Sequence, residues 1–265
     1  MKIAVLGGSG HVGRSVIRAL LGYGSDVVRQ VVVLNRRVVE PDTLPEGDPR
    51  LLQHVVDMSS ADALAEAGTP LLGDVDAAVS TMGVGSGKGP AELFRLVEVD
   101  LPSAFARSAR DNGVRRAVLL TGVGSDINST SAWMVGGAAE GKFFHFKGLV
   151  EKNFTDLGFP GGLTIFRPAA LLGTSHVPAF VNWLLPMVDW MVPMRLRSIH
   201  IHRLAAAMAS ATVTPPRAAA ATGEPGNGGD HVTILEGRTL FALLDRRRWQ
   251  ADPPSATPPA CPSWT

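Results

Sequence analysis

The residues of this chain best suited to chemistry stand near its beginning, where three glycines separate a short apolar run from a helical pattern. Gly7, Gly10 and Gly13 follow the spacing G-x-x-G-x-x-G. In a dinucleotide-binding loop the first glycine permits a tight turn, the second lets the backbone approach a pyrophosphate, and the third lets the helix pack closely on the strand. The helix N-terminus adds N–H groups and a positive dipole. The pattern predicts a dinucleotide site, although a purely structural turn is the alternative. The predicted contacts are Gly7, Ser9, Gly10, His11, Val12 and Gly13.

The end of the second apolar run indicates which dinucleotide binds. Proteins that bind NAD usually carry Asp or Glu there, which accepts a hydrogen bond from the ribose 2′-hydroxyl. This chain instead has Asn35, Arg36 and Arg37, and its next acidic residue is Glu40. Because a guanidinium group offers a phosphate a planar fork of charged donors, the pattern favours NADP(H); the alternative is two solvated arginines on a turn. Asp57, after the third run, would accept from the adenine amino group or simply cap the following helix.

The elements that must position these residues alternate along the chain. Apolar runs predict strands at 3–6, 27–34, 51–56, 76–80, 116–120, 163–166 and 231–235. Helical patterns cover 11–21, 59–67, 91–111 (ended by Gly113), a stretch through Lys147 and Asn153, 179–191, 201–212 and 238–248. Strands that alternate with helices predict an α/β fold, a doubly wound parallel sheet of Rossmann type with helices on both faces.

The two parts of the chain differ in regularity. We expect residues 1–170 to form an NADP(H)-binding domain and residues 171–250 to form a smaller, irregular substrate or interface region packed on it. Residues 213–230 have the composition of a surface insertion. From 251 to 265 five of 15 residues are proline, which predicts a disordered tail without a core.

Several stretches together resemble the atypical short-chain dehydrogenase/reductases, in particular the Tat-interactive-protein oxidoreductase and NmrA-like type. The similar stretches are GGSGHVG at 7–13, LNRR at 34–37, VVD at 55–57, TMGVGSGKGPAELFRLVEVD at 81–100, AVLLTGVGSD at 117–126, FKGLVEKNF at 146–154 and TIFRPAALLG at 164–173. The resemblance implies a Rossmann-type domain that binds NADP(H), with substrate contacts from the C-terminal part. It also implies cofactor contacts from Thr81, Met82, Gly83, Lys147 and Pro168, the last of which would shape the nicotinamide wall.

The resemblance further implies a catalytic set, which this chain carries only in part. The family uses a Ser or Thr after the fifth strand and a Tyr-x-x-x-Lys on the next helix, in which the tyrosine hydroxyl moves the proton. Thr121 matches the Ser/Thr and Lys147 matches the lysine, so both are the predicted catalytic residues, but Phe143 stands in the tyrosine position. Tyr23 is the single tyrosine of the chain and lies in the first helix–strand connection. His145 is a candidate substitute, although two residues along a helix rotate it about 200° away from the site.

Composition excludes other classes. With 25 Lys and Arg against 24 Asp and Glu, the chain has no global field to hold a nucleic acid or an anionic membrane. Its single cysteine, Cys261, excludes internal disulfides and thiolate zinc clusters, and fits a reducing compartment. His200 and His202 are half of a metal site at most, so no metal is predicted. No signal peptide or membrane span is expected, and the predicted location is cytoplasmic.

Two functions remain open at this stage. The first is an NADPH-dependent oxidoreductase that acts on a small carbonyl-like substrate. The second is a catalytically impaired, cofactor-binding regulator or scaffold with a protein partner, which the phenylalanine at position 143 favours. Neither excludes an oligomer.

Overall fold

The described part of the chain consists of residues 1–39, 47–84, 90–129, 142–173, 193–214 and 232–248, in a computed structural model of all 265 residues. The helix predicted at 179–191, the insertion at 213–230 (apart from its first two residues) and the tail at 251–265 lie outside these ranges.

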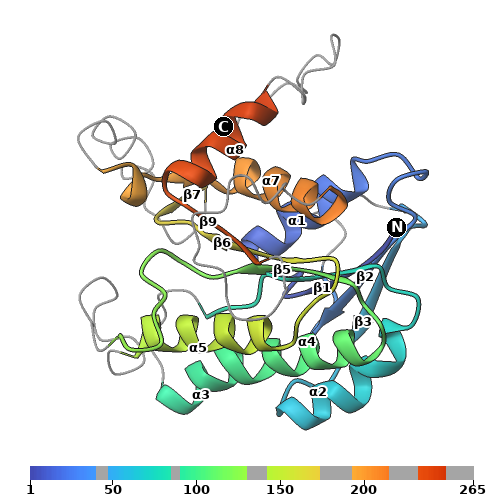
Figure 1. The fold of residues 1–265 in the computed structure, drawn as a ribbon. Helices are drawn as coiled ribbons and strands as arrows, with labels where there is room; N and C mark the ends of the chain where they lie inside the picture. The colour runs from blue at the N-terminus through green and yellow to red at the C-terminus, as the bar shows by residue number, and fades with distance from the viewer. Residues whose placement is uncertain (40–46, 85–89, 130–141, 174–192, 215–231, 249–265) are drawn as a thin grey trace, which may run out of the picture.

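A seven-stranded parallel sheet forms the centre of the molecule, in the order β3-β2-β1-β4-β5-β6-β9 (Figure 1). Its strands are β1 (Lys2–Leu6), β2 (Gln30–Asn35), β3 (Leu51–Val55), β4 (Ala77–Ser80), β5 (Arg116–Leu120), β6 (Leu163–Arg167) and β9 (Val232–Glu236). The central strands β1, β2 and β4 are buried except for the first residue of β1 and of β2, which is why they read as continuous apolar runs rather than alternating ones. The predicted doubly wound α/β fold is confirmed.

Helices cover both faces of this sheet (Figure 1). On one face lie α1 (His11–Leu21), α7 (Ile201–Val213) and α8 (Arg238–Arg248); on the other lie α2 (Ala61–Gly68), α3 (Ala91–Arg95), α4 (Leu101–Asp111) and α5 (Phe143–Asp156). One apolar core joins the sheet to α1, α7 and α8, and two further clusters join it to α2, α4 and α5. The described residues also include three short 3₁₀ or π segments, η2 (Thr69–Leu72), η3 (Leu96–Asp100) and η6 (Met194–Leu196).

The single long helix predicted at 91–111 is wrong in its interior, where the π segment η3 separates α3 from α4. Pro102 explains the change, because it has no N–H to donate to the carbonyl of Glu98 four residues earlier. A local widening of the helix accommodates the missing bond, and such π segments often occur at functional sites. Gly113, where the helix was predicted to stop, follows the C-cap residue Asn112 and has a φ of +82°, a conformation that favours glycine.

One predicted strand boundary needs correction, and the structure places the two histidines at a strand-to-helix junction. The strand predicted from residue 27 begins at Gln30, because the N–H groups of Val27 and Val28 donate to Gly24 O in a turn. His200 ends a two-residue strand, β8 (Ile199–His200), which pairs with β7 (Leu171–Leu172), whereas His202 belongs to α7. The two imidazoles therefore do not share one face of a strand.

The strand order has a switch point between β1 and β4. The chain winds from β1 outward to β2 and β3, then crosses back to β4 and continues the other way, and Leu6 of β1 pairs with Ser80 of β4. In open α/β sheets, ligands bind in the crevice outside the carboxyl ends of the strands at such a point. The glycine-rich corner after β1 lies there.

Candidate functional site

The glycine-rich corner is shaped by contacts that only glycine allows. Gly7 has a φ of +87°, and a Cβ on it would lie 2.7 Å from the amide nitrogen of Met82. A Cβ on Gly13 would lie 2.2 Å from Gly7 O and 2.8 Å from Thr81 Oγ1, so α1 packs directly on the turn. A Cβ on Gly10 would touch only Gly7 O, at 3.4 Å, which leaves its outer side open to an approaching ligand.

Gly8 is a further residue that the turn requires and that the spacing argument did not select. A Cβ there would lie 2.4 Å from Val33 Cγ1 of the neighbouring strand. The sequence places Gly8 directly after Gly7, but glycine is required there because of a contact with β2, which the local sequence does not show.

Hydrogen bonds fasten this corner to the two neighbouring strands. Ser9 N donates to Asn35 Oδ1 of β2 over 3.2 Å. The Thr81 hydroxyl, just after β4, donates to the carbonyls of Leu6 and Gly7, each over 3.2 Å. Among the described residues no side chain caps the N-terminus of α1, so these residues leave the N–H groups of the helix end available to an anion.

The end of β2 carries one buried amide and two exposed arginines. Asn35 is 2% exposed, and its Nδ2 donor has no hydrogen-bond partner among the described residues. Arg36 and Arg37 are exposed and make no ion pair with any residue in the described ranges. Because β2 lies beside β1, these donors stand next to the glycine-rich corner.

A buried ion pair lies behind the loop that follows β4. Lys147 Nζ of α5 is 2.6 Å from Glu98 Oε2, and the two side chains are only 9% and 1% exposed. Glu98 Oε1 also accepts the N–H of Val84 over 2.7 Å. Gly83 leaves room for the pair, since a Cβ there would lie 3.1 Å from Glu98 Oε1 and 3.3 Å from Lys147 Nζ. Sequence reasoning missed Glu98, whose one signal was its place in an otherwise apolar helical stretch.

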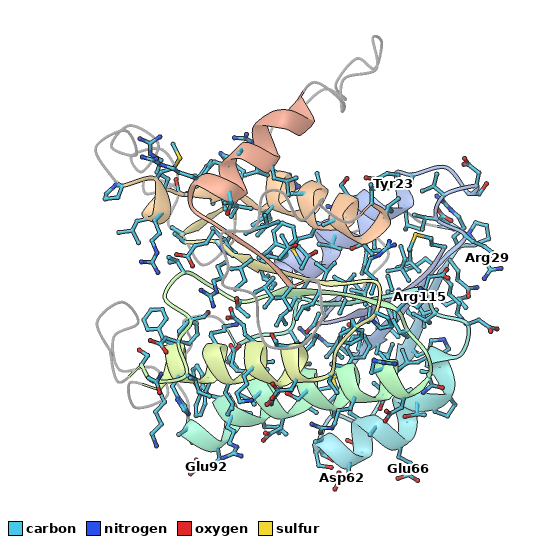
Figure 2. The ribbon with its side chains drawn as sticks, viewed as in Figure 1. Tyr23, Arg29, Asp62, Glu66, Glu92 and Arg115 are labelled. Carbon is cyan, nitrogen blue, oxygen red and sulfur yellow. The ribbon has the colours of Figure 1, made fainter. Side chains whose placement is uncertain are left out.

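The first turn of α5 shows what surrounds the lysine. Lys147 Nζ lies 5.6 Å from the centroid of the Phe143 ring, within the range of a cation–π contact. His145 Nδ1 is 2.5 Å from Ile127 O, so its imidazole docks α5 on the loop after β5. Gly148 allows this docking, because a Cβ on it would lie 2.2 Å from Ile127 N. Tyr23 is at the other end of the molecule, beyond the C-terminal end of α1 (Figure 2).

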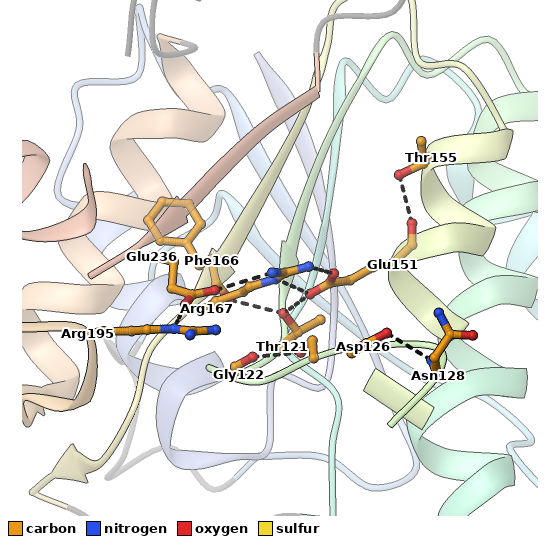
Figure 3. Close-up of polar contacts among 11 residues, drawn as sticks. Thr121, Gly122, Asp126, Asn128, Glu151, Thr155, Phe166, Arg167, Arg195 and Glu236 are labelled. Atoms are coloured by element: carbon orange, nitrogen blue, oxygen red, sulfur yellow. Dashed lines mark hydrogen bonds and ion pairs between the residues drawn. The ribbon is translucent and has the colours of Figure 1, made fainter. Parts of the chain in front are cut away.

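Thr121 belongs to a chain of polar contacts at the carboxyl ends of β5, β6 and β9 (Figure 3). Its hydroxyl donates to Glu151 Oε1 over 2.5 Å, and Arg167 Nε donates to the same oxygen over 2.9 Å. Arg167 also forms an ion pair with Glu236, and Arg195 pairs with the other oxygen of that carboxylate. Burial alone would lower the pKa of Arg167, but the hydrogen bonds and charges of Glu151 and Glu236 raise it above its usual value.

Two further predicted residues have structural contacts of their own. The Asp57 carboxylate accepts the N–H of Ser59 over 2.8 Å, and this hydrogen bond holds the pKa of Asp57 below its usual value. Ser60, rather than Asp57, caps α2 by accepting the N–H of Ala63. Pro168 is buried after β6, and its carbonyl accepts the N–H of Val123.

The structure thus brings the predicted cofactor contacts to one edge of the sheet. They follow β1, β2, β3, β4 and β6, and Lys147 reaches the same edge from α5. In the part of the chain described, no group of three His, Cys, Asp or Glu side chains is placed to hold a metal ion. None of the described helices combines the length and hydropathy that a bilayer crossing requires.

Two curated proteins share sequence similarity with the chain. Protein fmp52, mitochondrial, from Aspergillus niger is 30% identical over 173 residues, which cover 65% of this chain and 67% of that protein. Protein FMP52, mitochondrial, from Candida albicans is 25% identical over 183 residues, which cover 65% of this chain and 68% of that protein. No family model matches the chain.

Both relatives are named as mitochondrial proteins, and this contradicts the cytoplasmic location predicted above. The prediction was wrong because a nearly neutral chain with one cysteine fits either compartment, so composition could not discriminate between them.

Solved structures share the fold. DesIV, a dTDP-glucose 4,6-dehydratase from Streptomyces venezuelae with NAD and TYD bound, superposes with a TM-score of 0.58 and 21% identity over 95% of this chain and 82% of that one. The oxidoreductase ylbE from Lactococcus lactis gives a TM-score of 0.54 and 21% identity over 81% of this chain and 86% of that one. At these identities the likeness establishes the α/β architecture alone.

Proposed function

Since the chain belongs to the FMP52 protein family, we propose that it is an oxidoreductase that binds a nicotinamide dinucleotide, preferably NADP(H), at the carboxyl edge of its sheet. The observation that carries this proposal is the glycine-rich corner at the switch point between β1 and β4. Its open side at Gly10 lies next to the exposed Arg36 and Arg37.

The residues present fit the proposed group. The open face of Gly10 and the uncapped N-terminus of α1 suit a pyrophosphate. Asn35 Nδ2 is a buried donor without a partner in the described ranges, which an acceptor on a bound nucleotide would satisfy. Arg36 and Arg37 would bind a 2′-phosphate with charged, forked donors. The NAD bound to proteins of the same fold supports the general class of ligand.

The chemistry proposed is transfer of hydride, which the bound nicotinamide would supply, to a small carbonyl-like substrate. Lys147 would bind ribose hydroxyls, as the resemblance to the atypical short-chain dehydrogenase/reductases of Tat-interactive-protein and NmrA-like type implies. Its ammonium group carries a proton that a developing alkoxide can accept, and Glu98 holds that group in place at 2.6 Å. Phe143 offers no proton, so we expect slow turnover, since general acid–base catalysis contributes about 10²–10⁴-fold to a rate.

Calorimetric titration with NADPH and NADH tests the cofactor assignment. We expect NADPH to bind more tightly, and Arg36→Ala/Arg37→Ala to lower the affinity for NADPH about 10- to 100-fold while it changes that for NADH little. Arg29→Ala is the matched control, because Arg29 is exposed at the opposite edge of the sheet (Figure 2). Equal affinity of the wild-type chain for both dinucleotides, or no affinity for either, would refute the assignment.

A specific observation favours a second candidate function, a cofactor-binding regulator without turnover. The Thr121 hydroxyl already donates to Glu151, Lys147 already pairs with Glu98, and Phe143 replaces the tyrosine. Absorbance at the NADPH band, followed with a panel of carbonyl substrates, separates the two functions. Tight binding with no turnover, and slow turnover gained by Phe143→Tyr, would establish the regulator; robust wild-type turnover would exclude it.

A mitochondrial location is part of the proposal, because both relatives carry that designation. Fractionation of cells that express the tagged full chain tests it. We expect the protein to sediment with mitochondria, and its recovery only in the post-mitochondrial supernatant would contradict the proposal.

A further inference from the structure

A cavity of 580 Å³ opens at the carboxyl ends of β6 and β9. This volume lies within the range of about 300–1,000 Å³ that is common for pockets that bind small molecules. The cavity is lined by the ends of both strands, the 3₁₀ turn η6 and the start of α8. Arg167 links the cavity to the candidate site, because it directly precedes Pro168.

The polar lining of this cavity carries a net positive charge. The lining contains three arginines and one carboxylate, namely Arg167, Arg195, Arg238 and Glu236. The guanidinium of Arg167 is already shared between Glu151 and Glu236, so it is largely neutralised. Three guanidinium groups against the two carboxylates of Glu151 and Glu236 leave one positive charge in excess, and Arg238 carries it because it has no ion pair among the described residues.

Arg195 and Arg238 both have donors that make no ion pair within the described ranges. Arg195 donates through Nε to Glu236 and is 61% exposed, so its two terminal nitrogens are not used by this ion pair. Arg238 is exposed and makes no ion pair with any described residue. It also begins α8, whose first turn has no acidic residue, so its charge lies at the positive end of the helix dipole.

The arrangement around Arg195 is fixed rather than incidental. Gly237 allows a close approach of two backbones, since a Cβ on it would lie 3.1 Å from Arg195 Cα. Glu236 then connects Arg195 to Arg167, and Arg167 connects through Glu151 to the Thr121 hydroxyl (Figure 3). A continuous chain of polar contacts thus relates the cavity to the predicted catalytic threonine.

The cavity is distinct from the glycine-rich corner. β9 lies four positions from β1 in the sheet, which at about 4.8 Å per strand separates the two regions by about 19 Å along the same edge. An anion bound in the cavity would therefore not occupy the pyrophosphate position.

We propose that this cavity binds the anionic group, a carboxylate or a phosphate, of a small substrate, with Arg195 and Arg238 as its ligands. Forked guanidinium donors suit both groups. Pro193, Met194 and Ile234 in the lining would contact the apolar part of the same molecule. The assignment of the bound molecule as the substrate rests on the proposed oxidoreductase function, whereas anion binding itself does not.

The test is calorimetric titration of the full chain, freed of nucleotide, with inorganic phosphate and separately with malonate. We expect at least one of the two to bind at millimolar concentration. Arg195→Gln/Arg238→Gln should weaken that binding at least about tenfold. Arg238→Gln alone should weaken it measurably without loss of folding, because no described ion pair depends on Arg238. Arg29→Gln, at the opposite edge of the sheet, should bind as the wild type does.

The outcomes separate this proposal from the proposed function. Binding of phosphate but not malonate assigns a phosphorylated substrate, and the reverse assigns a carboxylate. If Arg36→Gln/Arg37→Gln weakens anion binding while Arg195→Gln/Arg238→Gln does not, the anion occupies the nucleotide crevice and the proposal is overturned. No binding of either anion also overturns it. Failure of NADPH to bind in a parallel titration would refute the proposed function and leave an anion site at Arg195 and Arg238 intact.

Discussion

The buried ion pair of Glu98 and Lys147 should contribute strongly to the free energy of unfolding. Replacement of one partner at a time measures the cost of leaving the other charge buried without its partner. Glu98→Gln would leave the ammonium group buried without a counter-charge, and Lys147→Met would leave the carboxylate in the same condition. With exposures of 1% and 9% and a separation of 2.6 Å, the pair belongs to the class in which loss of one partner costs about 3–5 kcal/mol.

The double variant Glu98→Gln/Lys147→Met removes both charges and should cost much less than the sum of the two single changes. Its amide can still accept the N–H of Val84, which Glu98 Oε1 now accepts over 2.7 Å. Urea unfolding followed by far-ultraviolet circular dichroism gives the free energy of unfolding of all four proteins. The non-additivity of the cycle isolates the interaction between the two side chains.

A matched control lies on the same helix. Lys152 and Asp156 also form an ion pair, at 2.5 Å, but their side chains are 55% and 58% exposed. An exposed pair at this spacing is worth about 0.3–0.5 kcal/mol, so Lys152→Met and Asp156→Asn should change stability little. If the Glu98 and Lys147 variants behaved like this control, with small and additive losses, the argument from burial would be refuted.

Three further outcomes are expected. Gly13→Ala should lower the free energy of unfolding by about 1–3 kcal/mol and weaken dinucleotide binding, because the added Cβ would lie 2.2 Å from the carbonyl oxygen of Gly7. Urea unfolding and calorimetric titration measure the two effects. Gly73→Ala is the control in both, because its Cβ would meet nothing within 4 Å. Thr121→Val should lower the free energy of unfolding by about 1.5–3 kcal/mol, because it removes a buried hydrogen bond to the Glu151 carboxylate. Thr121→Ser keeps the hydroxyl and should retain most of this stability. Equal losses in the two variants would contradict the role of the hydrogen bond. The N–H of Ser59 lowers the pKa of Asp57, so this carboxylate stabilises the fold above the unfolded pKa of about 3.9, and the contribution disappears as the pH falls through the lower folded value. Asp57→Ala should therefore reduce stability at neutral pH and not in strong acid, as urea unfolding across pH will show; a difference that persists in acid would argue against the hydrogen bond.

Sequence patterns predicted best the helices and strands whose bounds are set by residues within or beside the element itself. The helix at His11–Leu21 and the strand at Arg116–Leu120 have their predicted bounds, because apolar periodicity and flanking glycines define both. The parallel sheet follows from the alternation of such elements. The interruption of the helix at 91–111 was not predicted, because it depends on a single proline and on how the widened turn is packed.

The contacts that the sequence could not predict join residues far apart. Glu98 and Lys147 are 49 positions apart, and only the packing of α5 on η3 brings them together. Arg167 meets Glu236 because β6 and β9 are neighbours, a pairing that no local pattern encodes. The predicted roles of Thr121 and Lys147 in catalysis stay predictions, although the structure now shows what each side chain contacts.

The packing of α7 on α1 has a consequence for how the protein is made. These helices share one core although about 190 residues separate their starts, and β9 completes the sheet later still. A ribosome that adds about 5–20 residues each second needs about 10–40 seconds to cover that distance. Throughout this interval the part of α1 that packs on α7 lacks its native cover, so the emerging chain should depend on a chaperone, and a protein truncated before α7 should be insoluble.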